Sequence, residues 1–266
     1  MISVITPTFN TDPQVLARTW ASLKAQTFTD WEWIVWDDST RTETWAQLYG
    51  FAADERYRLK VYRSHIHSGI IGETKRNGFM IAQGDILVEL DHDDVLTPNA
   101  LAEIDNAFRD ESIGFVFSDW CEILPDGMSG KYPDGWAFGY GRDYWCDEEQ
   151  VWALSVPTID EVTLQHIVSV PNHVRAWRAS VYRELGGHDA TLQIADDYDL
   201  IVRTALVTKW KHIPKMLYKQ FLSPSSAQRV HNDEIQKLVS ELRERYLPAI
   251  SDRFAIMGKD VDERIS

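Results

Sequence analysis

Strand and helix signals alternate over residues 1–119, and this alternation restricts the possible folds more than any other feature of the chain. The runs that read as strands are short and apolar, at 2–6, 33–36, 59–62, 86–90 and 115–117. Apolar residues recur at helical spacing between several of them, at 13–23, 72–83 and 98–109. Strands that are apolar on both faces are typical of parallel sheets covered by helices on both sides. The sequence therefore predicts an α/β fold with a mostly parallel, Rossmann-like sheet.

Polar side chains follow four of the five predicted strands. They are Thr6, Thr8 and Asn10 after the first, Asp37 and Asp38 after the second, Asp91, Asp93 and Asp94 after the fourth, and Asp119 after the fifth. In open parallel sheets, ligands bind at the edge where the carboxyl ends of the strands lie. We therefore expect one composite binding site at this edge.

The segment Asp91-His92-Asp93-Asp94 directly follows the apolar run 86–90. Carboxylates this close together repel one another and lose hydration, so they need a cation or must stay protonated. Hard oxygen ligands suit Mg2+ or Mn2+, and such ions also bind diphosphates. A metal site is favoured over the alternative, a solvated acidic turn that caps the helix starting near Pro98. His92 points away from its neighbours if the strand geometry continues, so the pattern gives it no role of its own.

The alternation fails between about 120 and 170, where aromatic residues lie among Gly and Asp. These aromatic residues are Tyr132, Trp136, Tyr140, Tyr144, Trp145 and Trp152. They form either the local core of an irregular insertion or a platform for a sugar ring. Further helices are expected at 179–185, around 196–206 and from Ile235, the last one amphipathic. The polar residues 251–266 are expected to be loose.

Composition and charge exclude several classes of protein. The net charge is −14 and no block of Lys or Arg stands out, so we expect no nucleic-acid partner. The two cysteines, Cys121 and Cys146, give neither a disulfide framework nor metal-ligand spacing. No run reaches the roughly 20 apolar residues of a membrane span, and the N-terminus lacks the features of a signal peptide. A cytoplasmic protein without an integral membrane span is expected.

Five motifs, in this order, resemble those of the family 2 glycosyltransferases, which have the GT-A fold. They are Thr6-Pro7-Thr8-Phe9-Asn10, Asp37-Asp38-Ser39-Thr40, Lys75-Arg76-Asn77-Gly78, Asp91-His92-Asp93-Asp94, and Gly186-Gly187-His188-Asp189 with Asp196-Asp197-Tyr198-Asp199-Leu200. The resemblance implies an inverting transferase that uses a nucleotide-diphosphate sugar, usually a UDP-sugar, with Mn2+ or Mg2+. The acceptor would be a hydroxyl of a glycan, a lipid-linked molecule or another compound.

The resemblance also implies roles for parts of the chain. Residues 1–119 would form a nucleotide-sugar-binding half, 120–230 the acceptor-binding and catalytic-base half of the same domain, and 231–266 a C-terminal helix and tail. The donor would be contacted by Thr6, Pro7, Thr8, Phe9, Asn10, Asp37, Asp38, Arg76, Asp91 and, as part of its segment, His92. The metal would be held by Asp93, Asp91 and His231, although His231 is alternatively a surface histidine at a helix start. Asp197 would be the general base, with Asp196 as the alternative.

The chemistry of sugar transfer agrees with this division of roles. A divalent metal can neutralise the charge that develops on a departing nucleoside diphosphate. An acceptor hydroxyl is too weakly acidic to ionise alone, so a carboxylate must take its proton during attack. Inversion requires this carboxylate on the face opposite the leaving group, and the base should therefore come from a different segment than the metal ligands. Asp197, about a hundred residues beyond Asp93, meets this condition.

Two other functions are compatible with an α/β sheet that carries metal-binding aspartates. One is a sugar nucleotidyltransferase, which usually has a Gly-rich, basic phosphate loop after the first strand. This chain has Pro7-Thr8-Phe9-Asn10-Thr11-Asp12 at that place. The other is a catalytically inactive nucleotide-sugar-binding module, against which the joint presence of Asp91, Asp93 and Asp197 argues.

Overall fold

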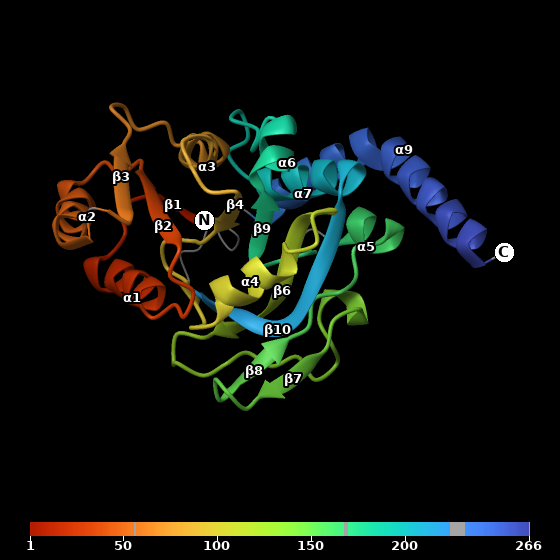
Figure 1. Ribbon diagram of the computed structural model, residues 1–266, viewed down its shortest axis with the longest axis horizontal. Coiled ribbons are helices and arrows are strands. Elements are labelled where there is room, and N and C mark those ends of the chain that lie inside the picture. Colours follow the sequence, from red (N-terminus) through yellow and green to blue (C-terminus); the bar gives the residue numbers. More distant parts are fainter. Residues whose placement is uncertain (56, 168–169, 224–231, 266) are drawn as a thin grey trace.

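The computed structural model describes residues 1–55, 57–167, 170–223 and 232–265. Within these ranges a ten-stranded sheet forms the centre of the molecule (Figure 1). Its main path has the strand order β3-β2-β1-β4-β9-β6-β10-β5, and the hairpin β7–β8 is attached to β6. The strands are β1 (Ile2–Thr8), β2 (Trp31–Asp37), β3 (Leu59–Arg63), β4 (Ile86–Glu89), β5 (Val95–Leu96), β6 (Ile113–Ile123), β7 (Asp143–Cys146), β8 (Val151–Leu154), β9 (Arg175–Arg178) and β10 (Lys209–Phe221).

Helices cover both faces of the sheet, as the apolar strands predict. They are α1 (Pro13–Lys24), α2 (Thr42–Glu55), α3 (Ile71–Met80), α4 (Ala100–Ala107), α5 (Glu161–His166), α6 (Ala179–Glu184), α7 (Asp196–Val207) and α9 (Asn232–Ile265), with a 3-10 turn η1 (Ala137–Gly139). In Figure 1, α1 and α4 lie on one side of the sheet and α3, α6 and α7 on the other. The start of α1 is as the sequence predicts, because the side chain of Asp12 accepts hydrogen bonds from two backbone N–H groups ahead of it and Pro13 opens the helix.

The first half of the sheet is parallel and brings three strand ends together. β1 pairs in parallel with both β2 and β4, and β2 pairs in parallel with β3. The register sets Thr8 beside Asp37, and Ile5 beside Glu89. The carboxyl ends of β1, β2 and β4 therefore lie at one edge, as expected. In contrast, β9 runs antiparallel between β4 and β6, which the sequence did not predict.

The fifth predicted strand is longer than expected, and Asp119 does not lie at its end. β6 continues to Ile123 because the long strand β10 runs parallel beside it. The carboxylate of Asp119 accepts hydrogen bonds from the hydroxyl of Tyr144 (3.1 Å) and the backbone N–H of Val156 (2.9 Å). Its Oδ1 also lies 2.7 Å from Nε2 of His212. Asp119 thus joins β6 to its neighbours and is not part of the polar edge.

The aromatic segment after β6 is partly a local core. The rings of Trp120 and Trp136 meet edge to face at 4.5 Å, and the indole N–H of Trp136 donates to the carbonyl of Ser155 (3.0 Å). Tyr140 and Trp145 remain exposed, at 53% and 43%. Trp120 and Trp136 therefore fit a local core, whereas the exposed Tyr140 and Trp145 fit a platform for a sugar ring.

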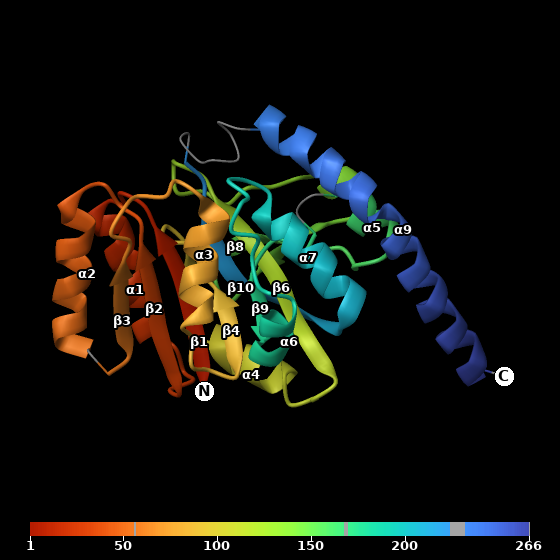
Figure 2. The ribbon, with the colours of Figure 1, turned by 90° about the horizontal axis from the view of Figure 1, so that it is seen from above.

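The last helix, α9, extends from the molecule as a single long element (Figures 1 and 2). Residues 251–265, which were expected to be loose, continue α9 as far as Ile265, and Ser266 lies outside the described residues. Ile250 is fully buried, Phe254 packs against Trp210, and Arg253 donates to the carbonyl of Ala205. These contacts hold the helix beyond its predicted amphipathic part.

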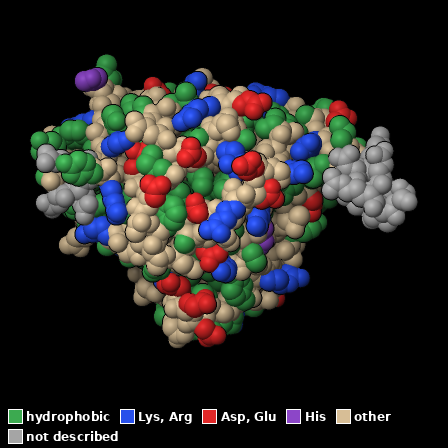
Figure 3. Space-filling view, in the orientation of Figure 1, with side chains coloured by type: hydrophobic (Ala, Val, Ile, Leu, Met, Phe, Trp, Pro, Cys, Tyr) green, Lys and Arg blue, Asp and Glu red, His purple; other side chains and the backbone are tan. Residues whose placement is uncertain are grey.

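Two surface properties bear on possible partners. On the face seen in Figure 3, acidic and basic side chains are interspersed. No helix in the part of the chain that the structure describes is long and apolar enough to cross a membrane.

Candidate active site

Hydrogen bonds join the loops that follow β1 and β2. Thr8 Oγ1 donates to Asp37 Oδ1 (3.1 Å), and the backbone N–H of Asn10 donates to Ser39 Oγ (2.7 Å). Thr6, by contrast, is fully buried, and its hydroxyl accepts the indole N–H of a core tryptophan. The two predicted segments therefore form one surface from Thr8 onward, while Thr6 belongs to the core of the sheet.

Asp38 orders the loop formed by residues 67–69. Its carboxylate accepts hydrogen bonds from the backbone N–H groups of Ser68 (3.0 Å) and Gly69 (3.1 Å). Its Oδ2 also lies 2.8 Å from Nδ1 of His67. The imidazole of His67 in turn stacks on Phe9, with ring centroids 4.8 Å apart, and Phe9 is 48% exposed. An exposed aromatic pair thus borders the polar edge.

Asp37 keeps one carboxylate oxygen without a hydrogen bond. Its Oδ1 accepts from Thr8 and from the backbone N–H of Ser39 (3.1 Å). Its Oδ2 has no hydrogen-bond partner within the described ranges and lies 3.7 Å from Nε of Arg63. This oxygen is buried and faces the guanidinium of Arg63.

The backbone of the acidic loop 91–94 is fixed by α1. Thr19 Oγ1 donates to the carbonyls of His92 (3.0 Å) and Asp94 (2.9 Å), and Arg18 Nη2 donates to the carbonyl of Asp93 (2.5 Å). These contacts engage carbonyls and leave the Asp93 carboxylate without a hydrogen bond or ion pair to any residue that the structure describes. Three hydrogen bonds from α1 thus hold the loop backbone, and none of them uses this carboxylate.

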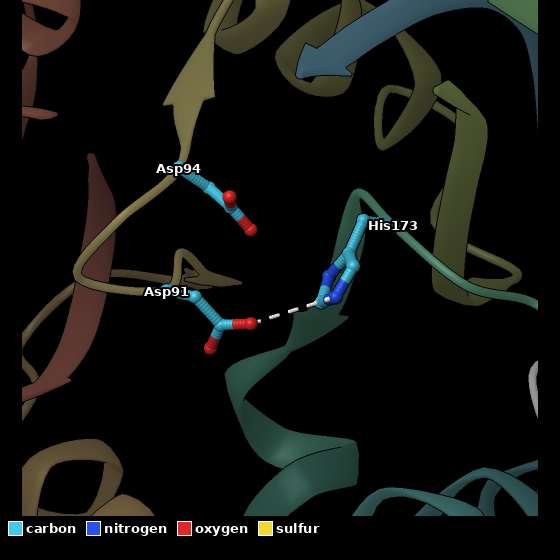
Figure 4. Close-up of side chains that lie close together, drawn as sticks. All are labelled: Asp91, Asp94 and His173. Carbon is cyan, nitrogen blue, oxygen red and sulfur yellow. Dashed lines mark ion pairs between the residues drawn. The ribbon is translucent and has the colours of Figure 1, made fainter. Parts of the chain in front are cut away.

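Asp91, Asp94 and His173 point toward one another (Figure 4). One potential ligand atom from each lies within 4.8 Å of the others, and His173 Nε2 is 3.6 Å from Asp91 Oδ2. The Asp94 carboxylate also accepts hydrogen bonds from the hydroxyl of Tyr218 (2.8 Å) and the backbone N–H of Phe221 (2.7 Å). The strand β10 thereby holds Asp94 in place.

The electrostatics of this group fit a divalent cation. Burial raises the pKa of Asp91 to about 6; Lys75 opposes the shift, and Glu89 and Asp93 add to it. Burial also raises the pKa of Asp94 well above its ordinary value, and Asp93 and Asp91 add to that shift. Burial keeps the pKa of His173 well below its usual range, so its imidazole is neutral and able to ligate. Hard oxygen donors that resist ionisation beside one another suit Mn2+ or Mg2+.

A buried ionic network lies behind the acidic loop and connects it with α7. Lys75 Nζ is 2.8 Å from Glu89 Oε1 and 3.2 Å from Asp196 Oδ2. Arg175 contacts Glu89 twice, through Nε (3.0 Å) and Nη2 (3.2 Å), and its Nη1 lies 3.0 Å from Asp197 Oδ2. Strand β4 thus supplies Glu89 to this network and ends two residues before Asp91, where the acidic loop begins.

The two aspartates at the start of α7 have different environments. The side chain of Asp196 is 4% exposed, whereas that of Asp197 is 34% exposed. Burial raises the pKa of Asp196 to about 6 although Lys75 opposes the shift. Burial also acts to raise the pKa of Asp197, but Arg175 and Lys75 outweigh it, and the pKa is lowered. Asp197 is therefore the accessible member of the pair and the one that ionises at lower pH.

The remaining predicted site residues are placed as follows. Arg76 is exposed on α3 and forms no ion pair with any described residue, whereas its neighbour Lys75 is buried. His231 lies outside the described residues. Sequence reasoning missed Lys75 and Glu89, although Glu89 is the single charged residue in the apolar run 86–90. A charge inside a strand that is buried on both faces is a signal for a buried ionic partner.

Known proteins with similar sequences are much longer than this chain. An uncharacterized protein y4gI of Sinorhizobium fredii is 28% identical over 85% of this chain and 23% of its own length. O-antigen biosynthesis protein RfbC of Myxococcus xanthus is 32% identical over 41% of this chain and 8% of its own length. Chondroitin synthase of Escherichia coli is 23% identical over 97% of this chain and 33% of its own length. The chain thus spans about a third or less of these relatives.

Solved structures confirm the GT-A fold, and a family model gives the family. S. aureus TarS 1-349 in complex with UDP-GlcNAc has a TM-score of 0.65 at 16% identity, over 95% of this chain and 72% of that one. GalNAc-T7 with UDP, GalNAc and Mn2+ has a TM-score of 0.65 at 19% identity, over 93% of this chain and 50% of that one. The model of Glycosyl transferase family 2 matches residues 3–145. Because this match covers more than half of the sequence, the chain belongs to glycosyl transferase family 2.

Proposed function

We propose that this protein transfers a sugar from a UDP-sugar to an acceptor hydroxyl, with inversion and with Mn2+ or Mg2+. The observation that carries the proposal is the ionic network of Lys75, Glu89 and Arg175. It connects the acidic loop 91–94 with the start of α7, about a hundred residues further along the chain. One site thereby combines carboxylates suited to a metal with a separate carboxylate suited to remove a proton.

The donor is proposed to bind at the ends of β1 and β2. Asp37 or Asp38 is proposed to accept the imide N–H of uracil, a group that cytosine lacks. Two similar proteins support a UDP-sugar. One is named UDP-Glc:alpha-D-GlcNAc-diphosphoundecaprenol beta-1,3-glucosyltransferase, from E. coli, and the other is the TarS complex with UDP-GlcNAc.

The cation is proposed to be held by Asp91 and Asp93, beside Asp94 and His173. The Asp93 carboxylate is free of described partners, while that of Asp94 is engaged by Tyr218 and a backbone N–H. When bound, the cation would neutralise charge on the departing diphosphate. The sequence also predicts His231 as a ligand, and that role stays a prediction.

Asp197 is proposed to accept the proton of the acceptor hydroxyl. It is ionised and partly exposed, which a general base needs in order to reach its substrate. Asp196 is buried against Lys75 and is assigned a structural role. The acceptor is proposed to be a glycan, a lipid-linked molecule or another hydroxyl compound, and the exposed Tyr140 and Trp145 are available to pack against a sugar ring. The cytoplasmic location expected from the sequence stays a prediction.

Calorimetry of UDP binding with and without Mn2+ tests the donor and metal together. Wild type should bind UDP more tightly with Mn2+, and Asp93→Ala should lose this dependence while keeping the folded far-UV spectrum. Asp126→Ala is the matched control, because Asp126 lies in an exposed turn and, within the described residues, its carboxylate accepts the Met128 N–H alone. Unchanged Mn2+ dependence in Asp93→Ala would show that the metal assignment is wrong.

Hydrolysis of nucleotide sugars tests the activity, with water as the acceptor. The panel is UDP-glucose, UDP-galactose, UDP-N-acetylglucosamine and GDP-mannose, each with Mn2+. Release of UDP from at least one UDP-sugar is expected, and the anomer formed first should be inverted relative to the donor. Retention of configuration, or release from GDP-mannose alone, would contradict the proposal.

A further inference from the structure

We propose that Arg175 is the positioning residue of the catalytic base, holding the Asp197 carboxylate in one orientation and in its ionised form. This inference rests on the proposed function, in which Asp197 removes the acceptor's proton. Arg175 itself is buried, with a side chain only 3% exposed, so it stands behind the carboxylate and out of contact with substrate. Its action on the reaction would therefore be exerted through Asp197.

The orientation of Arg175 comes from the sheet. Glu89 meets its guanidinium at two points: Nη2 donates to Oε1 at 3.2 Å, and Nε lies 3.0 Å from Oε2 as an ion-pair contact without hydrogen-bond geometry. Glu89 lies on β4 and Arg175 on the neighbouring strand β9, where the two residues are register partners. Because the guanidinium is planar, the hydrogen bond and the ion-pair contact to one carboxylate together restrict the direction of its remaining nitrogen. That nitrogen, Nη1, lies 3.0 Å from Asp197 Oδ2.

The second oxygen of Asp197 is fixed from its own helix. The backbone N–H of Tyr198 donates to Asp197 Oδ1 at 2.8 Å. Each carboxylate oxygen therefore has one donor in the described structure. A carboxylate held in this way presents its remaining lone pairs in one direction, which is what a base must do to meet a bound hydroxyl.

The charges around Asp197 make Arg175 its principal counter-ion. Lys75 also faces Asp197, but its ammonium is in direct contact with two other carboxylates, Glu89 and Asp196. Burial keeps the pKa of both nearby histidines, His173 and His188, below the usual range, so both are neutral. The titratable and charged groups that face Asp197 are Arg175 and His173 near β9, Lys75 on α3, Glu89 on β4, His188 before α7 and Asp196 on α7. Loss of Arg175 would leave Lys75 as the one cation in this group against three carboxylates.

Arginine fits this place better than lysine. A lysine ammonium is a single point charge and cannot grip Glu89 at two points while also contacting Asp197. Arg175→Lys should therefore keep part of the electrostatic effect and lose the orientation. Arg175→Met removes both. Arg178→Met is the matched control on the same strand, since Arg178 donates to the carbonyls of Phe108, Asp110 and Ile113, away from this network.

The test measures hydrolysis of the UDP-sugar that wild type cleaves fastest, with Mn2+, as a function of pH. Arg175→Met should lower kcat by about 10- to 100-fold, as expected for a misplaced catalytic group, and leave UDP affinity within about twofold. The acid limb of its pH profile should move up by about one unit or more, because an opposite charge at this range favours the ionised carboxylate. Arg175→Lys should recover part of the pH shift, and Arg178→Met should match wild type.

A double variant separates positioning from general damage. In the Asp197→Asn background there is no base to position, so adding Arg175→Met should cause no further loss of rate. A further tenfold loss there, or an unmoved pH profile in Arg175→Met, would overturn the inference. An active Asp197→Asn protein would instead overturn the proposed function, so the two failures are distinguishable.

Direct titration covers the case in which a variant turns over too slowly to profile. Carbon-13 NMR of carboxyl-labelled aspartate, with the Asp197 signal assigned by its loss in Asp197→Asn, reports the ionisation of this group without turnover. Its midpoint should rise in Arg175→Met and stay at the wild-type value in Arg178→Met. If Arg175→Met does not fold, the same titration is done on Arg175→Lys, where an unmoved midpoint and full activity would refute the positioning role.

Discussion

Lys75 should be the strongest single support of the buried network, and Lys75→Met tests this. Its side chain is 9% exposed, and Nζ lies 2.8 Å from Glu89 and 3.2 Å from Asp196. After the substitution Glu89 keeps Arg175, but Asp196 keeps no charged partner among the residues that the structure describes. His188, 3.8 Å away, is neutral because burial lowers its pKa to about 3.

The expected cost follows from this geometry. Breaking a buried ion pair by removing one partner destabilises a protein by about 3–5 kcal/mol, because the other charge is left buried. For a chain of this size that corresponds to a fall in Tm of roughly 10 °C. Methionine fills a similar volume, so the cavity contribution is small. The control Lys215→Met removes a cation that is 54% exposed and pairs with Glu103, and it should cost less than about 1 kcal/mol.

The pH dependence of the loss identifies Asp196 as its source. The pKa of Asp196 is about 6 in the folded protein, above its ordinary value of 3.8, so the folded state binds the proton more tightly than the unfolded state. Stability contributed by this proton is present at low pH and is lost as pH rises through the folded pKa. Removal of Lys75 raises this pKa further. The difference in unfolding free energy between wild type and variant should therefore be small near pH 5 and grow toward pH 8.

Urea unfolding of wild type, Lys75→Met and Lys75→Met/Asp196→Asn at about pH 5 and 8 measures these quantities. The added Asp196→Asn should restore much of the loss at pH 8, because the amide needs no cation. A loss that is equal at both pH values, or that the second substitution does not reduce, would refute the reasoning.

Three further predictions concern the site and its support. Asp197→Asn should lower donor hydrolysis by about 100-fold or more while UDP affinity stays near wild type, and Asp196→Asn should lower it less. The reverse order in initial-rate assays would identify Asp196 as the base. UDP with Mn2+ should raise Tm more than CDP in a melting assay, because Asp37 or Asp38 is proposed to accept from the imide N–H that cytosine lacks, and equal shifts would contradict this. Gly72→Ala should destabilise the protein by about 1–3 kcal/mol in urea unfolding, because the added Cβ would lie 2.1 Å from a backbone carbonyl of the loop before α7. Gly50→Ala in α2 has open space around the added Cβ and should be neutral or stabilising in the same assay.

The sequence by itself determined the parts that are encoded locally. The apolar runs predicted β1, β2, β3 and β4, and the Asp12-Pro13 pair predicted the start of α1. These features depend on side-chain periodicity and on caps within a few residues. The order of the strands along the chain then placed the polar ends of β1, β2 and β4 at one edge. The motifs were sufficient to identify the family that the family model confirms.

Only the tertiary structure decided which polar residues act together. β9 enters the sheet antiparallel between β4 and β6, and this pairing brings Arg175 against Glu89, 86 residues earlier in the chain. The pairing of β6 with β10 likewise moved Asp119 from an expected edge into the sheet. Such pairings depend on which distant segments pack together, and no local pattern records them.

The same reason explains why neighbouring aspartates could not be told apart beforehand. Asp196 and Asp197 are adjacent and chemically identical, yet one is buried against Lys75 and the other is partly exposed beside Arg175. Burial and the position of the nearest cation determine which of two identical carboxyl groups is accessible and ionises at lower pH, and both are properties of the packed molecule.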